Sequence, residues 1–302
     1  MLQNIIPKDI IYMSQKLYMP RIIVAIILTL TAISASAQKN HNSSDNTNNA
    51  FSQGEVALYK IHFGFVNAGE ATISVGDDIH IINDKPCYNL EVSGKTVGVF
   101  ALAATLEDKW GTFVDTTSLL PEKFYLRVRE MSYRKKQNIL FEQSEDKAIV
   151  QKLNKETGEF IRADTFNVPS HIRDIVSGAY FLRTFNLDTL QIGNSIRIDG
   201  FFDDTVYNMH IKLTGKEIIN TKAGKKEALV LSPILPNNKL FDGGDAIQIW
   251  LSDDTHKIPL KVKAKLLIGS LDITLKEYTP GIKHPENEDY FKKKRKRRKD
   301  KT

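Results

Sequence analysis

The residues best suited to chemistry lie in the stretch Trp250-Leu251-Ser252-Asp253-Asp254, with His256 close behind. Two adjacent carboxylates beside an imidazole could bind a cation or exchange protons with a substrate. Adjacent residues on a strand point to opposite faces, however, and no third ligand follows at a metal-binding spacing. Ser-Asp-Asp is also typical of turns, because Asp side chains accept hydrogen bonds from nearby backbone N–H groups. We therefore predict a turn here, with Trp250 anchoring the preceding strand in the core.

The other reactive side chains form no recognisable catalytic or metal-binding motif. Asn67-Ala68-Gly69 predicts a tight hairpin turn, which leaves Glu70 as a weak candidate for a ligand contact. Cys87 is the single cysteine, so an intrachain disulfide is excluded. The sequence shows no base that would activate its thiol, and we expect Cys87 to be buried as a small apolar residue. The histidines lack zinc-ligand spacing, and phosphate-loop, dinucleotide and nucleophile-elbow motifs are absent. We expect no catalytic residues, no metal and no cofactor, and the sequence does not identify ligand-binding residues.

A basic run near the end of the sequence is its most polarised feature. It consists of Lys292, Lys293, Lys294, Arg295, Lys296, Arg297, Arg298 and Lys299. In an exported protein the available polyanions are lipid headgroups and acidic polysaccharide, and each basic residue near such a surface contributes about 1 kcal/mol. We predict that this run contacts an anionic envelope surface. The alternative is a solubilising tail that has no partner.

The distribution of charge argues against nucleic acid as a partner. The net charge is +6, of which residues 292–302 supply +8 and residues 1–37 supply +2, so residues 38–291 carry −4. The predicted folded part is therefore mildly acidic and has no overall charge that would attract nucleic acid.

An export signal is the clearest feature near the start of the sequence. Residues 22–33 form an apolar run that basic residues precede and Ala35-Ser36-Ala37 follows. The run is shorter than the ~20 apolar residues of a membrane-spanning helix. We predict a signal peptide over residues 1–37, with Met19 as an alternative start and cleavage before Gln38. A retained N-terminal anchor is the alternative. We expect an exported protein of the periplasm or the outer-membrane surface, with release from the cell as an alternative and no transmembrane span after cleavage.

Alternation of apolar and polar residues dominates the rest of the sequence and predicts a mainly β protein. We expect a disordered polar leader over residues 38–54, one β-rich domain over residues 55–280 and a disordered basic tail over residues 281–302. Gly76-Asp77-Asp78 and Asp203-Asp204 are among the predicted turns. The strand candidates are 56–65, 71–75, 87–96, 109–115, 123–131, 134–142, 147–153, 160–166, 195–202, 205–214, 216–221, 225–231, 246–251, 259–267 and 270–278.

One segment predicts a clear helix. Pro169-Ser170 supplies a breaker and an N-cap for a helix over about residues 171–185. Its predicted buried face consists of Ile172, Ile175, Val176, Ala179 and Leu182. Residues 97–106 are a weaker candidate that periodicity does not distinguish from a buried strand. We predict a curved antiparallel sheet that forms a barrel or half-barrel, with the helix of residues 171–185 packed on it or plugging it.

Several segments together resemble domain-of-unknown-function family 3108. They are Phe63-Gly64-Phe65-Val66-Asn67-Ala68-Gly69-Glu70-Ala71, Thr112-Phe113-Val114-Asp115, Asp174-Ile175, Tyr180-Phe181-Leu182-Arg183 and Trp250-Leu251-Ser252-Asp253-Asp254. The resemblance extends over roughly residues 55–278 and implies an exported envelope protein of Gram-negative type with a curved β-rich fold. It implies no activity and therefore no catalytic residues.

Three hypotheses about function follow. The first is a non-enzymatic envelope protein that binds an apolar or amphiphilic ligand, such as a lipid, in the concavity of its sheet. The second is an envelope scaffold or assembly factor that contacts a protein partner through an exposed apolar patch. The third is a hydrolase of glycan or lipid, which would need converging carboxylates with raised pKa values.

Overall fold

A computed structural model describes residues 48–221, 224–234, 246–266 and 269–282. The predicted signal peptide and basic run lie outside the described residues. The elements are β1 (Val56–Phe63), β2 (Val66–Ile82), β3 (Lys85–Thr96), α3 (Gly98–Ala103), β4 (Leu106–Asp115), β5 (Pro121–Glu130), β6 (Tyr133–Glu142), β7 (Lys147–Leu153), β8 (Phe160–Asn167), α4 (Ile175–Thr184), the 3₁₀ turn η1 (Leu187–Thr189), β9 (Ser195–Phe202), β10 (Thr205–Thr221), β11 (Gly224–Pro233), β12 (Ile247–Ser252), β13 (Pro259–Lys265) and β14 (Ser270–Thr279).

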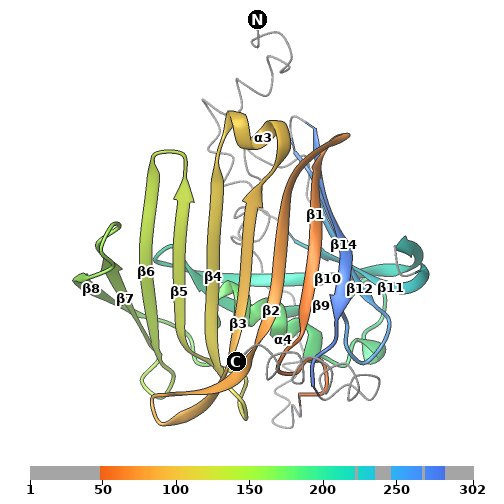
Figure 1. Cartoon of the computed structure of the whole chain (residues 1–302). Coiled ribbons are helices and arrows are strands. Elements are labelled where there is room, and N and C mark those ends of the chain that lie inside the picture. The colour runs from red at the N-terminus through yellow and green to blue at the C-terminus, as the bar shows by residue number, and fades with distance from the viewer. Residues whose placement is uncertain (1–47, 222–223, 235–245, 267–268, 283–302) are drawn as a thin grey trace, which may run out of the picture.

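The strands form one continuous sheet that curls over its own inner face. Its 14 strands run in the order β8-β7-β6-β5-β4-β3-β2-β1-β14-β13-β12-β11-β10-β9, and each described pair is antiparallel. The first and last strands of this order do not pair, so the sheet is not closed. Figure 1 shows β9 and β10 passing behind the front strands, with α4 in between. The ring of Trp110 on β4 stacks on Phe202 of β9 with centroids 5.4 Å apart. The predicted curved antiparallel sheet is confirmed.

Two predicted turns are wrong because each lies within the long strand β2. The chain reverses at Gly64 and Phe65, and Gly64 adopts a positive φ of 58° that favours glycine. Asn67-Ala68-Gly69 continues into β2, where a Cβ on Gly69 would lie 2.8 Å from the Lys95 carbonyl oxygen. Gly69 therefore permits close strand approach. Gly76-Asp77-Asp78 forms a bulge in the pairing of β2 with β3. The candidates 205–214 and 216–221 are likewise one bulged strand, β10.

The predicted helix is present but starts later than the sequence suggests. Arg173 is extended and pairs with β9, since its N–H donates to the Asp199 carbonyl and its carbonyl accepts from the Phe201 N–H. The N-cap is Asp174 rather than Ser170, and its carboxylate accepts from the N–H groups of Val176 and Ser177. The predicted buried face is correct except for Ala179, which is exposed. Within residues 97–106 the chain forms the short helix α3.

The predicted disordered leader is wrong for its last residues, 48–54, which pack against the fold. Asn48 accepts hydrogen bonds from the N–H groups of Ala50 and Phe51. Both residues are buried, and the Phe51 ring meets the Tyr180 ring edge-on at 4.8 Å. A few apolar residues in a polar segment are enough to dock it when the partner surface is already formed.

Candidate ligand-binding site

A band of half-buried apolar side chains crosses the inner face of the sheet, which is the face that α4 covers. These side chains, here called the inner apolar band, are Ala71, Ile73, Val92, Met209, Ile249, Val262 and Ile273. Strand register makes the band continuous, because Ile73 lies opposite Val92, Ile249 opposite Val262, and Val262 opposite Ile273. Alternation alone places every second residue of these strands on this face.

The inner apolar band lies between clusters that are fully buried. On one side the core cluster joins Phe124 and Phe141 of the front strands to Tyr180 of α4 and Phe201 of β9. On the other side a second cluster contains Ile61, Ile247, Ala264 and Leu271. The band side chains pack against these clusters while remaining partly exposed. This arrangement provides an apolar surface suited to an apolar ligand.

A buried ion pair fixes α4 at one end of the sheet. Arg183 and Glu55 are only 4% and 3% exposed, and their side chains form hydrogen bonds of 2.6 and 2.9 Å. Arg183 also donates to the carbonyls of Ala50 and His256, each at 3.0 Å. Burial opposes the charge of Arg183, but the Glu55 carboxylate outweighs it and raises the pKa of the guanidinium. We call this group, together with Tyr278, whose hydroxyl donates to Glu55 at 3.1 Å, the latch.

The turn predicted after Trp250 begins at Asp253, beside the latch, and Trp250 lies buried on the preceding strand β12. Asp254 accepts hydrogen bonds from the N–H groups of His256 and Lys257, and from the Ser252 hydroxyl. Asp253 instead pairs with Lys216 at 2.7 Å. The two carboxylates therefore serve separate partners, and the turn orients the His256 carbonyl toward Arg183. This geometry matches turn chemistry rather than a cation site.

Two buried carboxylates, which the sequence analysis missed, lie on the inner face of β4 and β5. Asp108 hydrogen-bonds to Glu130 and accepts the Arg129 N–H at 3.1 Å. Burial outweighs these hydrogen bonds and raises the pKa of Asp108 to about 6. This direct contact does not match a glycosidase, whose two catalytic carboxyl groups lie about 5 Å or more apart. The antiparallel pairing of the consecutive strands β4 and β5 brings these residues together from positions 22 residues apart, and their spacing in the sequence matches no catalytic motif.

The structure places the remaining predicted candidates in separate surroundings. Glu70 lies on the outer face, 3.8 Å from Lys276. Cys87 is fully buried, and burial raises the pKa of its thiol to about 11, so at neutral pH the nucleophilic thiolate is scarce. Among the described residues, His, Cys, Asp and Glu form no group of three or more that could hold a metal ion. The described part of the chain also contains no helix that is long and apolar enough to cross a membrane.

Comparisons with known proteins identify the family of this chain. No curated protein matches it. Among solved structures it is similar to a β-barrel-like protein of domain-of-unknown-function family DUF1849 from Brucella abortus, with 9% identity, a TM-score of 0.49 and coverage of 75% of this chain and 97% of that one. It is also similar to a Bacteroides fragilis protein described as exported with a YmcC-like fold, with 7% identity, a TM-score of 0.30 and coverage of 76% and 97%. At these scores the similarity carries no argument about function. The model of the protein family of unknown function DUF3108 matches residues 58–276, nearly the whole sheet, and the chain therefore belongs to this family.

Proposed function

We propose that the protein is exported to the cell envelope and binds an apolar or amphiphilic ligand on its inner apolar band, without catalysing a reaction. The observation that carries this proposal is the band itself, where apolar side chains remain half-buried beside filled clusters. A ligand that covers them gains roughly 25 cal/mol for each Å² of apolar surface removed from water. The apolar run and Ala35-Ser36-Ala37 support export.

Native mass spectrometry of protein purified from its own envelope tests the proposal. We expect a bound mass of lipid size, and saturable binding of dansyl-undecanoic acid after the native ligand has been extracted. Val92→Trp should reduce both, because it fills the inner apolar band. Ser93→Trp is the matched control, since the next residue of β3 points to the opposite face. A wild-type protein that carries no such mass and binds no probe would overturn the proposal.

A hydrolase has less support, because Asp108 and Glu130 contact each other directly. An envelope scaffold that binds a protein partner is supported by exposed apolar residues at one rim of the sheet. The charged side chains at this rim favour a different occupant.

A further inference from the structure

A row of charged side chains crosses the outer face of the sheet near one rim. Strand register places Lys60 opposite Glu70, Glu70 opposite Lys95, Lys95 opposite Glu107, Glu107 opposite Arg129, and Arg129 opposite Arg134. The charges alternate in sign as far as Arg129, and then two positive charges face each other. Opposite charges in directly facing positions stabilise a sheet and like charges destabilise it. The row contains four positive and two negative side chains, and Arg134 at its end faces no acid within the row.

The hydrogen bonds of the two arginines do not compensate for this repulsion. Arg129 lies 3.5 Å from Glu107, and both side chains are mostly exposed. Arg134 donates to the carbonyls of Met131 and Tyr133 at 2.6 and 2.8 Å. These carbonyls orient its guanidinium without neutralising it, and the partners observed for Arg134 within the described ranges are carbonyls and not carboxylates. An external anion between Arg129 and Arg134 would relieve the repulsion.

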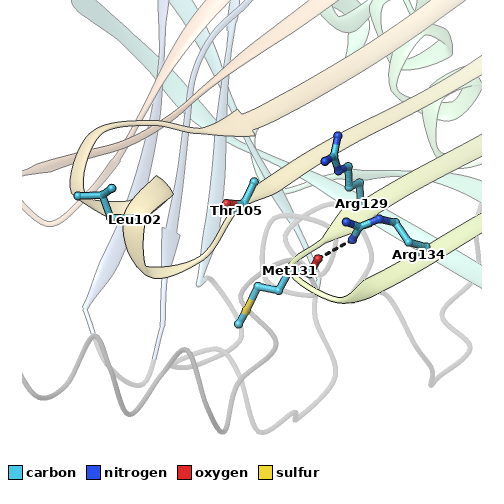
Figure 2. Close-up of a pocket in the computed structure, with 5 residues that line it drawn as sticks. All are labelled: Leu102, Thr105, Arg129, Met131 and Arg134. Carbon is cyan, nitrogen blue, oxygen red and sulfur yellow. Dashed lines mark hydrogen bonds between the residues drawn. The ribbon is translucent and has the colours of Figure 1, made fainter.

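The two arginines line a surface pocket with a volume of about 360 Å³. Figure 2 shows them beside Thr105, with Leu102 on the α3 side and Met131 at the turn between β5 and β6. Leu102 is 84% exposed and Met131 is 56% exposed. The pocket thus combines two cations with exposed apolar side chains, and its volume suits a small headgroup.

The pocket belongs to a rim that carries further exposed apolar residues. The turn β1–β2, the helix α3 and the turn β5–β6 lie at the same end of the sheet (Figure 1). The large exposed apolar residues of this rim are Phe65, Val66, Val99, Leu102, Met131 and Tyr133. The turns at the opposite end carry acidic residues, but Lys147 pairs with Glu145 there and Lys216 pairs with Asp253. What sets the α3 end apart is the two arginines beside its exposed apolar side chains, a combination that suits an anionic membrane surface.

We propose that this rim docks on a membrane surface that contains anionic phospholipid. A headgroup phosphate lies between Arg129 and Arg134, and Leu102 and Met131 enter the interfacial region of the bilayer. Guanidinium groups suit phosphate because they donate two parallel hydrogen bonds. This docking goes beyond the proposed function and does not depend on a ligand at the inner apolar band.

The fluorescence of a tryptophan introduced at the rim reports membrane docking directly, in the full chain that remains after signal cleavage. Leu102→Trp is mixed with vesicles of phosphatidylglycerol and brominated phosphatidylcholine, because bromine quenches only indoles that enter the bilayer. Trp110 and Trp250 are buried and give a constant background. We expect at least twofold quenching for Leu102→Trp. Ile218→Trp, at a position that is 69% exposed on β10, should show none.

Charge variants then test the role of the arginines. Adding Arg129→Gln and Arg134→Gln to Leu102→Trp should weaken vesicle binding about tenfold. Adding Lys225→Gln and Lys226→Gln instead removes the same charge from exposed positions on β11 and should leave binding unchanged. The basic tail is present in every variant, so differences between them report the rim.

Each contrary outcome overturns part of the proposal in a recognisable way. An unquenched Leu102→Trp indole overturns membrane docking and leaves the rim to a protein partner. Full quenching after loss of both arginines overturns the phosphate site. Equal quenching on vesicles without phosphatidylglycerol overturns the requirement for anionic phospholipid. Displacement by millimolar inorganic phosphate at constant ionic strength assigns the site to a free anion and overturns the lipid source. Absence of a ligand at the inner apolar band changes none of these readings.

Discussion

Breaking the latch should destabilise the protein more than any comparable change at the surface. Arg183→Met removes the guanidinium but keeps an unbranched apolar side chain of similar length. It leaves the Glu55 carboxylate buried without a counter-charge, and it removes the hydrogen bonds that Arg183 donates to the carbonyls of Ala50 and His256. Glu55 directly precedes β1 and Arg183 lies in α4, 128 residues away, so the loss also loosens the attachment of the helix.

The expected loss follows from the burial of the pair. Removing one partner of a buried ion pair costs about 3–5 kcal/mol, because the remaining charge has been desolvated without compensation. In a domain of this size, each kcal/mol lowers the melting temperature by roughly 2–4 °C. Arg183→Met should therefore melt roughly 6–20 °C below the wild type. The double variant Glu55→Leu with Arg183→Met removes both charges and should cost less than Arg183→Met alone.

Urea denaturation of both single variants and the double variant measures the coupling free energy. Arg197 and Asp199 provide a matched control, since they form a similar two-bond pair at 2.8 and 2.9 Å but are 47% and 21% exposed, far more than the latch residues. Arg197→Met should cost less than about 1 kcal/mol. A loss of the same size for Arg183→Met, or single losses that simply add in the double variant, would refute the argument that burial makes the latch strong.

Four further outcomes are expected. N-terminal sequencing of the exported protein should begin at or near Gln38, whereas uncleaved protein in the cytoplasm would contradict export. Ile175→Asp should lower the free energy of unfolding by about 3–5 kcal/mol, because an unpaired charge enters a buried face; an unchanged melting temperature would refute this. Burial raises the pKa of Asp108 from 3.8 to about 6, so between these pH values the folded protein binds a proton that the unfolded chain has lost. The free energy of unfolding should therefore fall as pH rises across this range. Solvent near Asp108 and Glu130 limits this loss of stability to about 1–2 kcal/mol. Asp108→Asn should lose less stability over the same pH range. Melting temperatures that change equally with pH in the variant and the wild type would contradict the assignment. A chain that ends at Tyr290 should keep its melting temperature but lose much of its salt-sensitive binding to anionic vesicles, and equal binding would exclude a role for the tail.

Local patterns predicted the strands well where alternation ended at an unambiguous turn. The candidate 195–202 matches β9 because Asp203-Asp204 follows it, and both Asp residues adopt the positive φ that such a turn requires. The same reasoning failed at Asn67-Ala68-Gly69. Small residues serve turns, but they also permit close backbone approach, and only the neighbouring strand decides between the two.

Features built from distant residues were not predictable from spacing. Glu55 and Arg183 meet because α4 crosses the end of the sheet, and neither residue has a local signature of burial. The facing pair Arg129 and Arg134 follows from the register of β5 and β6. Register depends on turn geometry and on which face is buried, so a pattern of single residues leaves it undetermined.

The segments that resemble family 3108 lie at two ends of the sheet, and the two groups of segments have different roles. Asp174 caps α4, Arg183 forms the latch and Asp254 closes the adjoining turn, so all three maintain the fold. The segment 63–71 instead forms the turn β1–β2 at the apolar rim and contributes Ala71 to the inner apolar band. Substitutions at the latch should therefore lower stability together with binding, whereas substitutions at exposed Phe65 should weaken membrane docking at constant stability. A Phe65→Ser variant that melts like the wild type but binds anionic vesicles several-fold more weakly would demonstrate this separation, and unchanged binding would contradict it.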